Sequence, residues 1–242
     1  MELNADVGEQ CGDDITLIPL VDRVNIATGA HAGGGIEMRH KIVIAHHAGC
    51  HIGAHIAYND PSNFGRLSHR RALTEQQLRT SIRKQLDEFL GAASKHKATV
   101  DHIKPHGALY HDMHTDSTIR NVIITEAREH NLALMGMMIG DLETHTTTHG
   151  VRFIPEGFAD RAYTPDGTLL SRDHPDAVHA DPLTAVNQAH ELARQYVTTH
   201  TGERLNVHVR SICVHGDNPK AISLTRRIRT SLHEDGYLTV GA

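Results

Sequence analysis

Histidine and carboxylate side chains recur in this chain just where short apolar runs end. The last such run, Ile212–Val214, stops at His215 and Asp217, and Pro219 then opens an amphipathic segment. An imidazole beside a carboxylate can move protons or hold a metal ion. A buried strand that carries both groups at its carboxyl end, just before a helix, is typical of sites in α/β barrels. We therefore predict His215 as a catalytic residue and Asp217 as a substrate- or phosphate-binding residue.

The first segment of the chain offers an amide and a carboxylate on one face of a strand. Asn4 and Asp6 alternate with apolar Leu3 and Ala5, so a period of two turns both polar side chains the same way. Polar groups that point into a barrel are costly unless they are paired. Asp6 is a candidate catalytic residue and Asn4 a candidate substrate ligand, and a purely structural polar cluster is the alternative.

A glycine-dense segment, residues 25–35, carries His31 in a turn where backbone can approach a ligand closely. Neither GxxxxGK[ST] nor GxGxxG is present, so the segment predicts no standard phosphate loop. His31 is a candidate substrate- or phosphate-binding residue, and a tight turn between a strand and a helix is the alternative.

Two further strand ends carry basic side chains. His55 lies at the end of one apolar run, and Lys104 and His106 alternate across the end of another. A lysine beside imidazoles at a strand end can bind an anion or donate a proton. All three are candidate catalytic residues, and a structural role for the two histidines is the alternative.

The segment 156–163 combines two carboxylates with a guanidinium. Arg161 can clamp a carboxylate or a phosphate with two parallel hydrogen bonds. Glu156 and Arg161 are candidate substrate- or phosphate-binding residues, and Asp160 is a candidate catalytic residue. The alternative is an internal bridge between Asp160 and Arg161 that holds a loop.

The converging imidazoles and carboxylates leave a metal site open. The candidate ligands for a divalent metal ion are Asp6, His55, His106 and His215, which lie on separate predicted strands. The short zinc patterns HExxH and CxxC are absent, so the sequence predicts no particular metal. GxSxG is absent as well, which argues against a nucleophilic serine.

Seven short apolar runs provide the strands that must position these residues. They span Glu2–Asp6, Val24–Ala27, His51–Ala54, His102–Lys104, Ala133–Met138, Arg152–Pro155 and Ser211–Val214. Helical patterns separate them, and this alternation implies parallel strands joined by crossovers. An open doubly wound sheet would gather its polar motifs at one switch point, whereas here they follow nearly every strand. We therefore predict an α/β fold, a seven-stranded TIM-like β/α barrel.

Capping signals mark the helices between these strands. Thr74 and Gln77 form a capping-box pattern ahead of an apolar stripe with helical spacing. Asp181 followed by Pro182 predicts another helix start, with a stripe that runs to Val197. Further helices are predicted over 36–48, from 117 and from 218–219.

Size and composition favour one globular domain over residues 1–242, with 39% hydrophobic and 22% charged residues. The chain has a net charge of −5 and no tryptophan, so neither its charge nor its aromatic content indicates nucleic-acid binding. No apolar stretch reaches transmembrane length, and the acidic N-terminus lacks the basic region of a secretory signal. We expect a cytoplasmic protein that binds neither nucleic acid nor a membrane.

Histidine is unusually frequent, with 22 residues in the chain. Many, such as His96 and His149, lie in polar segments and are expected on the surface. Position rather than number therefore identifies the candidates. The three cysteines lack CxxC spacing and are predicted to be free thiols, with Cys213 buried in a strand.

Six motifs, taken in this order, resemble the LamB/YcsF family: LNADVGE, NIATGAHAGG, IGAHIAY, KPHGALY, EGFADRAY and CVHGDNP. The resemblance spans residues 3–232. It implies a seven-stranded, TIM-like barrel related to sugar deacetylases, in agreement with the strand count.

The resemblance also implies a reaction. The chain would be one subunit of a 5-oxoprolinase, which opens the lactam 5-oxo-L-proline (pyroglutamate) to L-glutamate with ATP, and would act with partner subunits B and C. Lys104 and Arg161 would then serve phosphate or the substrate carboxylate, and one of the carboxylates would activate water. The alternatives are a metal-dependent amidase or deacetylase on the same barrel, which needs no ATP, and a non-catalytic lactam-binding component.

Overall fold

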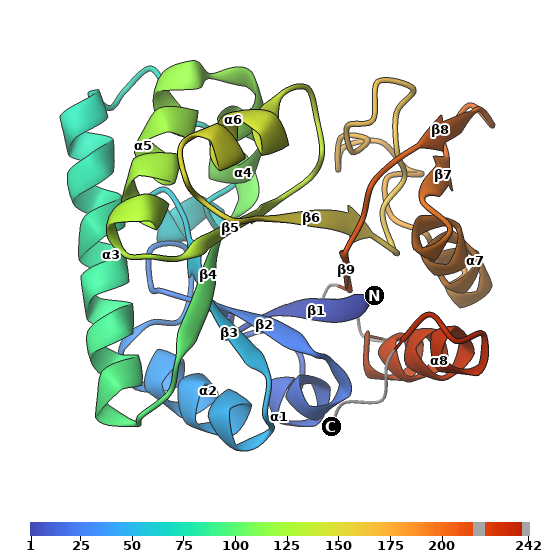
Figure 1. Ribbon diagram of the computed structural model, residues 1–242, viewed down its shortest axis with the longest axis horizontal. Helices are drawn as coiled ribbons and strands as arrows, with labels where there is room; N and C mark the ends of the chain where they lie inside the picture. Colours follow the sequence, from blue (N-terminus) through green and yellow to red (C-terminus); the bar gives the residue numbers. More distant parts are fainter. Residues whose placement is uncertain (215–220, 239–242) are drawn as a thin grey trace.

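Seven parallel strands close into a barrel, in the order β1-β2-β3-β4-β5-β6-β9 (Figure 1). Their bounds are β1 Glu2–Val7, β2 Arg23–Ala27, β3 His51–Ile56, β4 Val100–Pro105, β5 Ala133–Gly136, β6 Phe153–Phe158 and β9 Ser211–Cys213. Strand β1 pairs with both β2 and β9, and β6 pairs with β9, which completes the ring. Each predicted strand is found within a few residues of its predicted bounds, and the predicted barrel is confirmed.

The computed structural model describes residues 1–214 and 221–238. His215 and Asp217, predicted as site residues, lie outside the described residues, as does the helix start predicted at Asn218 and Pro219. Within the described ranges, no helix combines the length and the apolar character needed to span a bilayer. The three cysteines are free thiols, and Cys213 is buried, as predicted.

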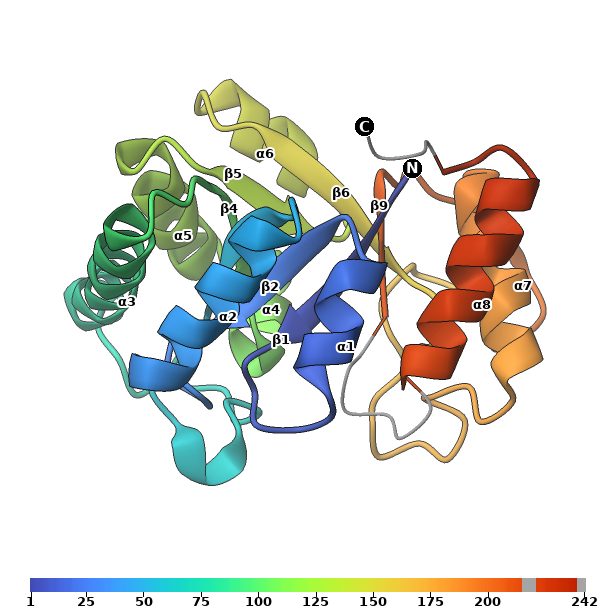
Figure 2. The same ribbon diagram turned by 90° about the horizontal axis from the view of Figure 1, so that it is seen from below.

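Helices pack around the outside of the barrel (Figures 1 and 2). The α-helices are α1 Asp14–Leu17, α2 Gly35–His47, α3 Glu75–Lys95, α4 Gly107–Thr115, α5 Ser117–Glu129, α6 Leu142–Thr148, α7 Pro182–Ala193 and α8 Ala221–Glu234, and η1 Ile18–Leu20 and η2 Pro61–Asn63 are single 3-10 turns. The capping box of Thr74 and Gln77 is present at the start of α3, and the Asp181 carboxylate accepts from two backbone amides of α7. Both predicted helix starts are confirmed.

The stripe predicted to run through α7 to Val197 is wrong. The helix ends at Ala193, and Gln195 has a φ of +64°, a left-handed conformation that a helix cannot continue through. Val197 instead lies in β7 Tyr196–Thr198, which pairs antiparallel with β8 Arg204–Asn206. This hairpin is an addition to the barrel that the sequence pattern did not predict.

Alternation along each strand separates an apolar outer face from a polar barrel interior. On β1, Leu3 and Ala5 belong to the hydrophobic core, whereas Asn4 and Asp6 hydrogen-bond to side chains of other strands. The interior also receives Asn25 of β2 and His102 of β4, both fully buried. The strands therefore bring polar side chains together along the whole axis of the barrel.

Glycine at position 53 makes room for one of these interior side chains. A Cβ atom there would collide with the imidazole of His102 on the neighbouring strand β4. The buried histidine and the facing glycine are thus a matched pair, and we expect a side chain at position 53 to displace the ring.

Candidate active site

A cavity of about 500 Å³ opens at the carboxyl ends of the strands. Asp6, His55, Lys104 and His106 line it, together with residues of the loop that follows β6. This end of a barrel is where enzymes of the fold place their active sites, and the volume suits a small ligand.

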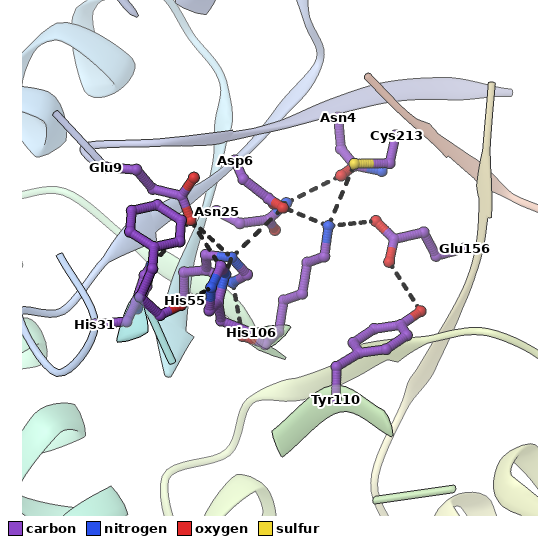
Figure 3. A network of polar contacts seen from close by, with 12 residues as sticks. Asn4, Asp6, Glu9, Asn25, His31, His55, His106, Tyr110, Glu156 and Cys213 are labelled. Carbon is purple, nitrogen blue, oxygen red and sulfur yellow. Dashed lines mark hydrogen bonds and ion pairs between the residues drawn. The ribbon is translucent and has the colours of Figure 1, made fainter. Parts of the chain in front are cut away.

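Lys104 of β4 forms the buried positive centre of this cavity. Three of its neighbours, Asp6, Glu156 and Cys213, are labelled in Figure 3. Its Nζ lies 2.8 Å from Oδ1 of Asp6 and 2.7 Å from Oε1 of Glu156, and donates to Sγ of Cys213 at 3.4 Å. Burial alone would lower the pKa of Lys104, but the surrounding negative groups hold that pKa well above its usual value. The ammonium group therefore stays charged, so it can stabilise negative charge and cannot act as a base.

Glu156 of β6 is held on both of its oxygens. Oε1 pairs with Lys104, and Oε2 accepts a hydrogen bond of 3.1 Å from the Tyr110 hydroxyl of α4. Burial and the neighbouring Glu156 raise the pKa of Tyr110 well above its usual value, so its hydroxyl keeps its proton and remains a donor. Tyr110 lies inside the KPHGALY motif, but the sequence pattern assigned it no role.

Asp6 keeps one carboxylate oxygen fixed and turns the other toward a histidine. Oδ1 accepts from Lys104 and from Nδ2 of Asn25, both at 2.8 Å. Oδ2 lies 3.4 Å from Nε2 of His55. The carboxylate is therefore held in one orientation with one edge toward the cavity, which is the arrangement that a general base needs.

Glu9 gathers three imidazoles beside Asp6. Its Oε1 lies 2.9 Å from Nε2 of His31 and 3.1 Å from Nδ1 of His106. Nε2 of His55 is 3.5 Å from the same oxygen, and the four residues offer atoms that all lie within 4.8 Å of one another. One carboxylate with three imidazoles is a donor set that suits a first-row transition metal.

The environment shifts the pKa values within this cluster in different directions. Burial lowers the pKa of His31 to about 4 and also lowers that of His106. Burial acts the same way on His55, but the carboxylates of Asp6 and Glu9 outweigh it and raise the pKa of that imidazole. Burial likewise opposes ionisation of Glu9, yet its bonds to the three imidazoles bring its pKa well below the usual value. Negative charge is therefore concentrated beside His55.

Residues 1–240 match the family model described as LamB/YcsF. The chain belongs to the LamB/YcsF family. Among curated relatives, a protein of Corynebacterium glutamicum named as the A subunit of 5-oxoprolinase is 39% identical over 240 residues, covering 96% of this chain and 94% of the relative. A protein of the same name from Deinococcus radiodurans is 35% identical, covering 97% and 94%.

Solved structures with a similar fold include a protein named for lactam use and a carbohydrate esterase. A lactam utilization protein from Thermus thermophilus superposes with a TM-score of 0.89 at 27% identity, covering 98% of this chain and 97% of that one. A family 4 carbohydrate esterase from Streptomyces lividans gives a TM-score of 0.52 at 13% identity, covering 97% and 88%. The esterase shares the fold, in agreement with the deacetylase-like barrel that the family resemblance implied.

Within this LamB/YcsF barrel, four of the predicted site residues meet directly at the cavity. Asp6, His55, Lys104 and His106 come together there as their strand-end positions indicated. His31, predicted for substrate or phosphate, instead lies against Glu9 with its imidazole fully covered. Glu9 received no prediction, although it stands in the LNADVGE motif.

Other predicted ligands of the LamB/YcsF site lie at its edge or below it. Asn4 is fully buried and does not line the cavity. Its side-chain amide donates to the Ser211 hydroxyl and accepts from the Asn25 amide. Arg161 lines the cavity, but it donates to the backbone carbonyls of two residues in its own loop, at 3.1 and 2.7 Å. Asp160 is buried beside it and does not line the cavity.

Proposed function

We propose that this chain is the A component of a 5-oxoprolinase, and that with partner subunits B and C it hydrolyses 5-oxo-L-proline to L-glutamate while ATP is consumed. The observation that carries the proposal is the likeness to curated relatives of that name, which covers 94% of their length. It includes every strand end that lines the cavity.

The chemistry of a lactam explains why such a reaction needs ATP. Its carbonyl carbon is a poor electrophile, and transfer of the γ-phosphoryl group to the lactam oxygen, with loss of ADP, activates it. Water then adds to that carbon, the ring C–N bond breaks as the nitrogen takes a proton, and a γ-glutamyl phosphate remains. A second water releases phosphate. The sum is one lactam, one ATP and two waters converted to glutamate, ADP and phosphate.

The buried residues of the cavity suit these steps. The Lys104 ammonium stabilises the negative charge that develops on the lactam oxygen and on the transferred phosphoryl group. The Oδ2 edge of Asp6 takes the proton of the attacking water. The protonated Asp6 then returns this proton to the ring nitrogen as the C–N bond breaks.

A second candidate function is hydrolysis of an amide without ATP, by a metal-dependent amidase or deacetylase. The group of Glu9, His31, His55 and His106 favours it, because metal ions in such donor sets activate water and polarise carbonyls. The two candidates differ in one requirement, the nucleotide, and a non-catalytic lactam-binding component differs from both in having no turnover.

A reconstituted assay separates these functions. The chain is purified together with subunits B and C, and glutamate formed from 5-oxo-L-proline is measured with ATP, without ATP and with a non-hydrolysable ATP analogue. The proposal predicts turnover only with ATP, at one ADP per glutamate. Turnover without ATP would overturn it in favour of the amidase, and saturable lactam binding without turnover would overturn it in favour of the binding component.

A further inference from the structure

Two cavity histidines face each other directly through one nitrogen of each ring. Nε2 of His55 and Nδ1 of His106 lie 3.0 Å apart, with the rings nearly perpendicular. A contact of this length between two nitrogens requires that one of them carry a hydrogen or that a cation lie beside both. When both rings are neutral, the partners of the other ring nitrogens decide where the two ring hydrogens lie.

Both of those other nitrogens are committed as donors. Nδ1 of His55 lies 3.0 Å from the carbonyl oxygen of Lys104, and Nε2 of His106 lies 2.9 Å from the carbonyl oxygen of Phe64. A carbonyl oxygen only accepts, so each of these nitrogens carries the hydrogen of its ring. In the neutral imidazoles the two facing nitrogens are therefore both lone pairs.

Glu9 adds a further acceptor to the same point. Its Oε1 lies 3.1 Å from Nδ1 of His106 and 3.5 Å from Nε2 of His55. Three acceptor atoms thus converge in a buried place, and electrostatic repulsion among them is strong because little water screens it. A positive charge at their centre would turn the repulsion into attraction.

His31 completes the group from the glycine-rich turn after β2. Its ring stacks on that of His106, with centroids 3.8 Å apart and an angle of 8° between the planes. Nε2 lies 2.9 Å from Oε1 of Glu9, and the buried Nδ1 has no hydrogen-bond partner among the described residues. The cluster therefore leaves this one nitrogen of His31 unsatisfied.

We infer that Glu9, His31, His55 and His106 bind one divalent transition-metal ion of the Zn²⁺ class. In a tetrahedral zinc site with bonds of 2.0–2.1 Å, neighbouring ligand atoms are about 3.3 Å apart. Four of the six contacts among these donor atoms range from 2.9 to 3.5 Å, and all six lie within 4.8 Å. The backbone carbonyls that hold His55 and His106 are the outer partners that orient metal-bound imidazoles.

The donor set also separates this ion from the Mg²⁺ that accompanies ATP. Mg²⁺ prefers oxygen ligands and an octahedral shell, whereas three nitrogens and one oxygen suit Zn²⁺, Co²⁺ or Fe²⁺. Resting on the proposed function, the ion would supply a Lewis acid to the lactam carbonyl. The binding itself does not depend on that function.

Metal binding is tested on the full chain alone, without partners, ATP or lactam. The protein is stripped with a chelator, and Zn²⁺ affinity is measured by competition with a chromophoric chelator, with metal content determined by elemental analysis. We expect one equivalent of Zn²⁺, and Co²⁺ in its place should give the intense visible absorption of a four-coordinate site. His106→Gln should weaken Zn²⁺ binding at least 100-fold.

His111→Gln is the matched control, because it removes an imidazole from the neighbouring turn of α4 that is no member of the cluster. It should leave the affinity unchanged, and Glu9→Gln should lower it while keeping the shape of the side chain. Circular dichroism confirms that each variant is folded.

The inference is overturned if stripped wild-type protein takes up no stoichiometric Zn²⁺, or if His106→Gln binds as tightly as wild type. It is also overturned if nitrogen NMR shows a proton on Nε2 of His55 that added Zn²⁺ does not displace. Each result is independent of glutamate formation, so failure of the metal site and failure of the proposed reaction are told apart.

Discussion

Both ends of the barrel interior hold a polar network around a buried cation and a buried histidine, but the two networks differ in character. At the amino end, Arg23 bridges Glu2 and Asp101 and donates to Nδ1 of His102 at 3.2 Å. Nε2 of His102 then donates to Oδ1 of Asn25 at 2.7 Å. In each of these contacts a donor meets an acceptor, so the network is satisfied without a bound ligand or ion.

At the carboxyl end the same residue types leave acceptors facing each other. When their rings are neutral, His55 and His106 meet through lone pairs, and a nitrogen of His31 has no partner among the described residues. Burial and histidine content therefore do not distinguish a structural network from a functional one. What distinguishes them is whether the groups satisfy one another, and the predictions below test that difference.

The largest effect is expected from Asp6→Asn in the assembled complex. The amide keeps the shape of the carboxylate but cannot accept a proton from water, so glutamate formation should fall by about 10²–10⁴-fold, the usual contribution of a general base. Asp141→Asn, which changes a surface carboxylate that is 69% exposed, is the control and should retain turnover. Equal activity of Asp6→Asn and wild type would remove Asp6 from the reaction.

At the amino end, Arg23→Met should affect stability and not turnover per folded molecule. It leaves Glu2 and Asp101 without their buried partner, and their partial exposure, 32% and 21% of the side chains, moderates the loss. We expect the free energy of unfolding to fall by about 2–3 kcal/mol in urea titrations. Arg152→Met removes a mostly exposed contact to the same Asp101 and should cost less than about 0.5 kcal/mol.

Gly53→Ala tests how tightly the amino-end network is packed. The new methyl group would collide with the His102 ring, and such overpacking should lower the free energy of unfolding by about 1–3 kcal/mol. Gly91→Ala, inside α3 near its C-terminal end and with open space around its Cβ position, should instead stabilise the protein by about 0.5–1 kcal/mol. Similar unfolding midpoints for the two variants would contradict the packing argument.

The smallest effect concerns acid stability. His102 and Arg23 hold the pKa of Asp101 below its usual value, against the opposing effect of burial. A carboxyl whose pKa is depressed on folding stabilises the protein above its unfolded pKa of about 4 and loses that contribution as the pH falls further. Asp101→Asn should therefore flatten the decline of unfolding free energy below pH 4, as measured by urea titrations at several pH values. An unchanged slope would mean that Asp101 is not charged more readily in the folded state.

The sequence predicts the barrel and those site residues that lie on strands, because both follow from strand periodicity. Strand periodicity fixes which side chains share a face, so Asp6, His55 and Lys104 could be assigned to one end of the barrel from their pattern alone. Asn4 shows the limit of that argument. It shares the face of Asp6 but lies one layer deeper, where Ser211 and Asn25 use its amide, and periodicity carries no information on depth.

The remaining residues lie where the chain leaves regular structure. Gly8, with a φ of +76°, turns the chain out of β1 and brings Glu9 back over the barrel, which no period-two pattern can predict. His31 reaches the cluster from a turn in which Gly33 and Gly34 are also left-handed. The hairpin of β7 and β8 was not predicted, because strands of three residues are too short to show a period-two pattern. The hairpin also lies outside the barrel.

The difference between the two ends is tested most directly by replacing one histidine at each and measuring both turnover and stability in the same assembled complex. His106→Gln should keep the unfolding midpoint close to that of wild type while ATP-dependent glutamate formation falls at least 100-fold. His102→Gln should lower the midpoint by several degrees while turnover per folded molecule stays within about threefold. If His106→Gln retains turnover, or if His102→Gln abolishes it without loss of stability, the carboxyl-end cluster is not the active site.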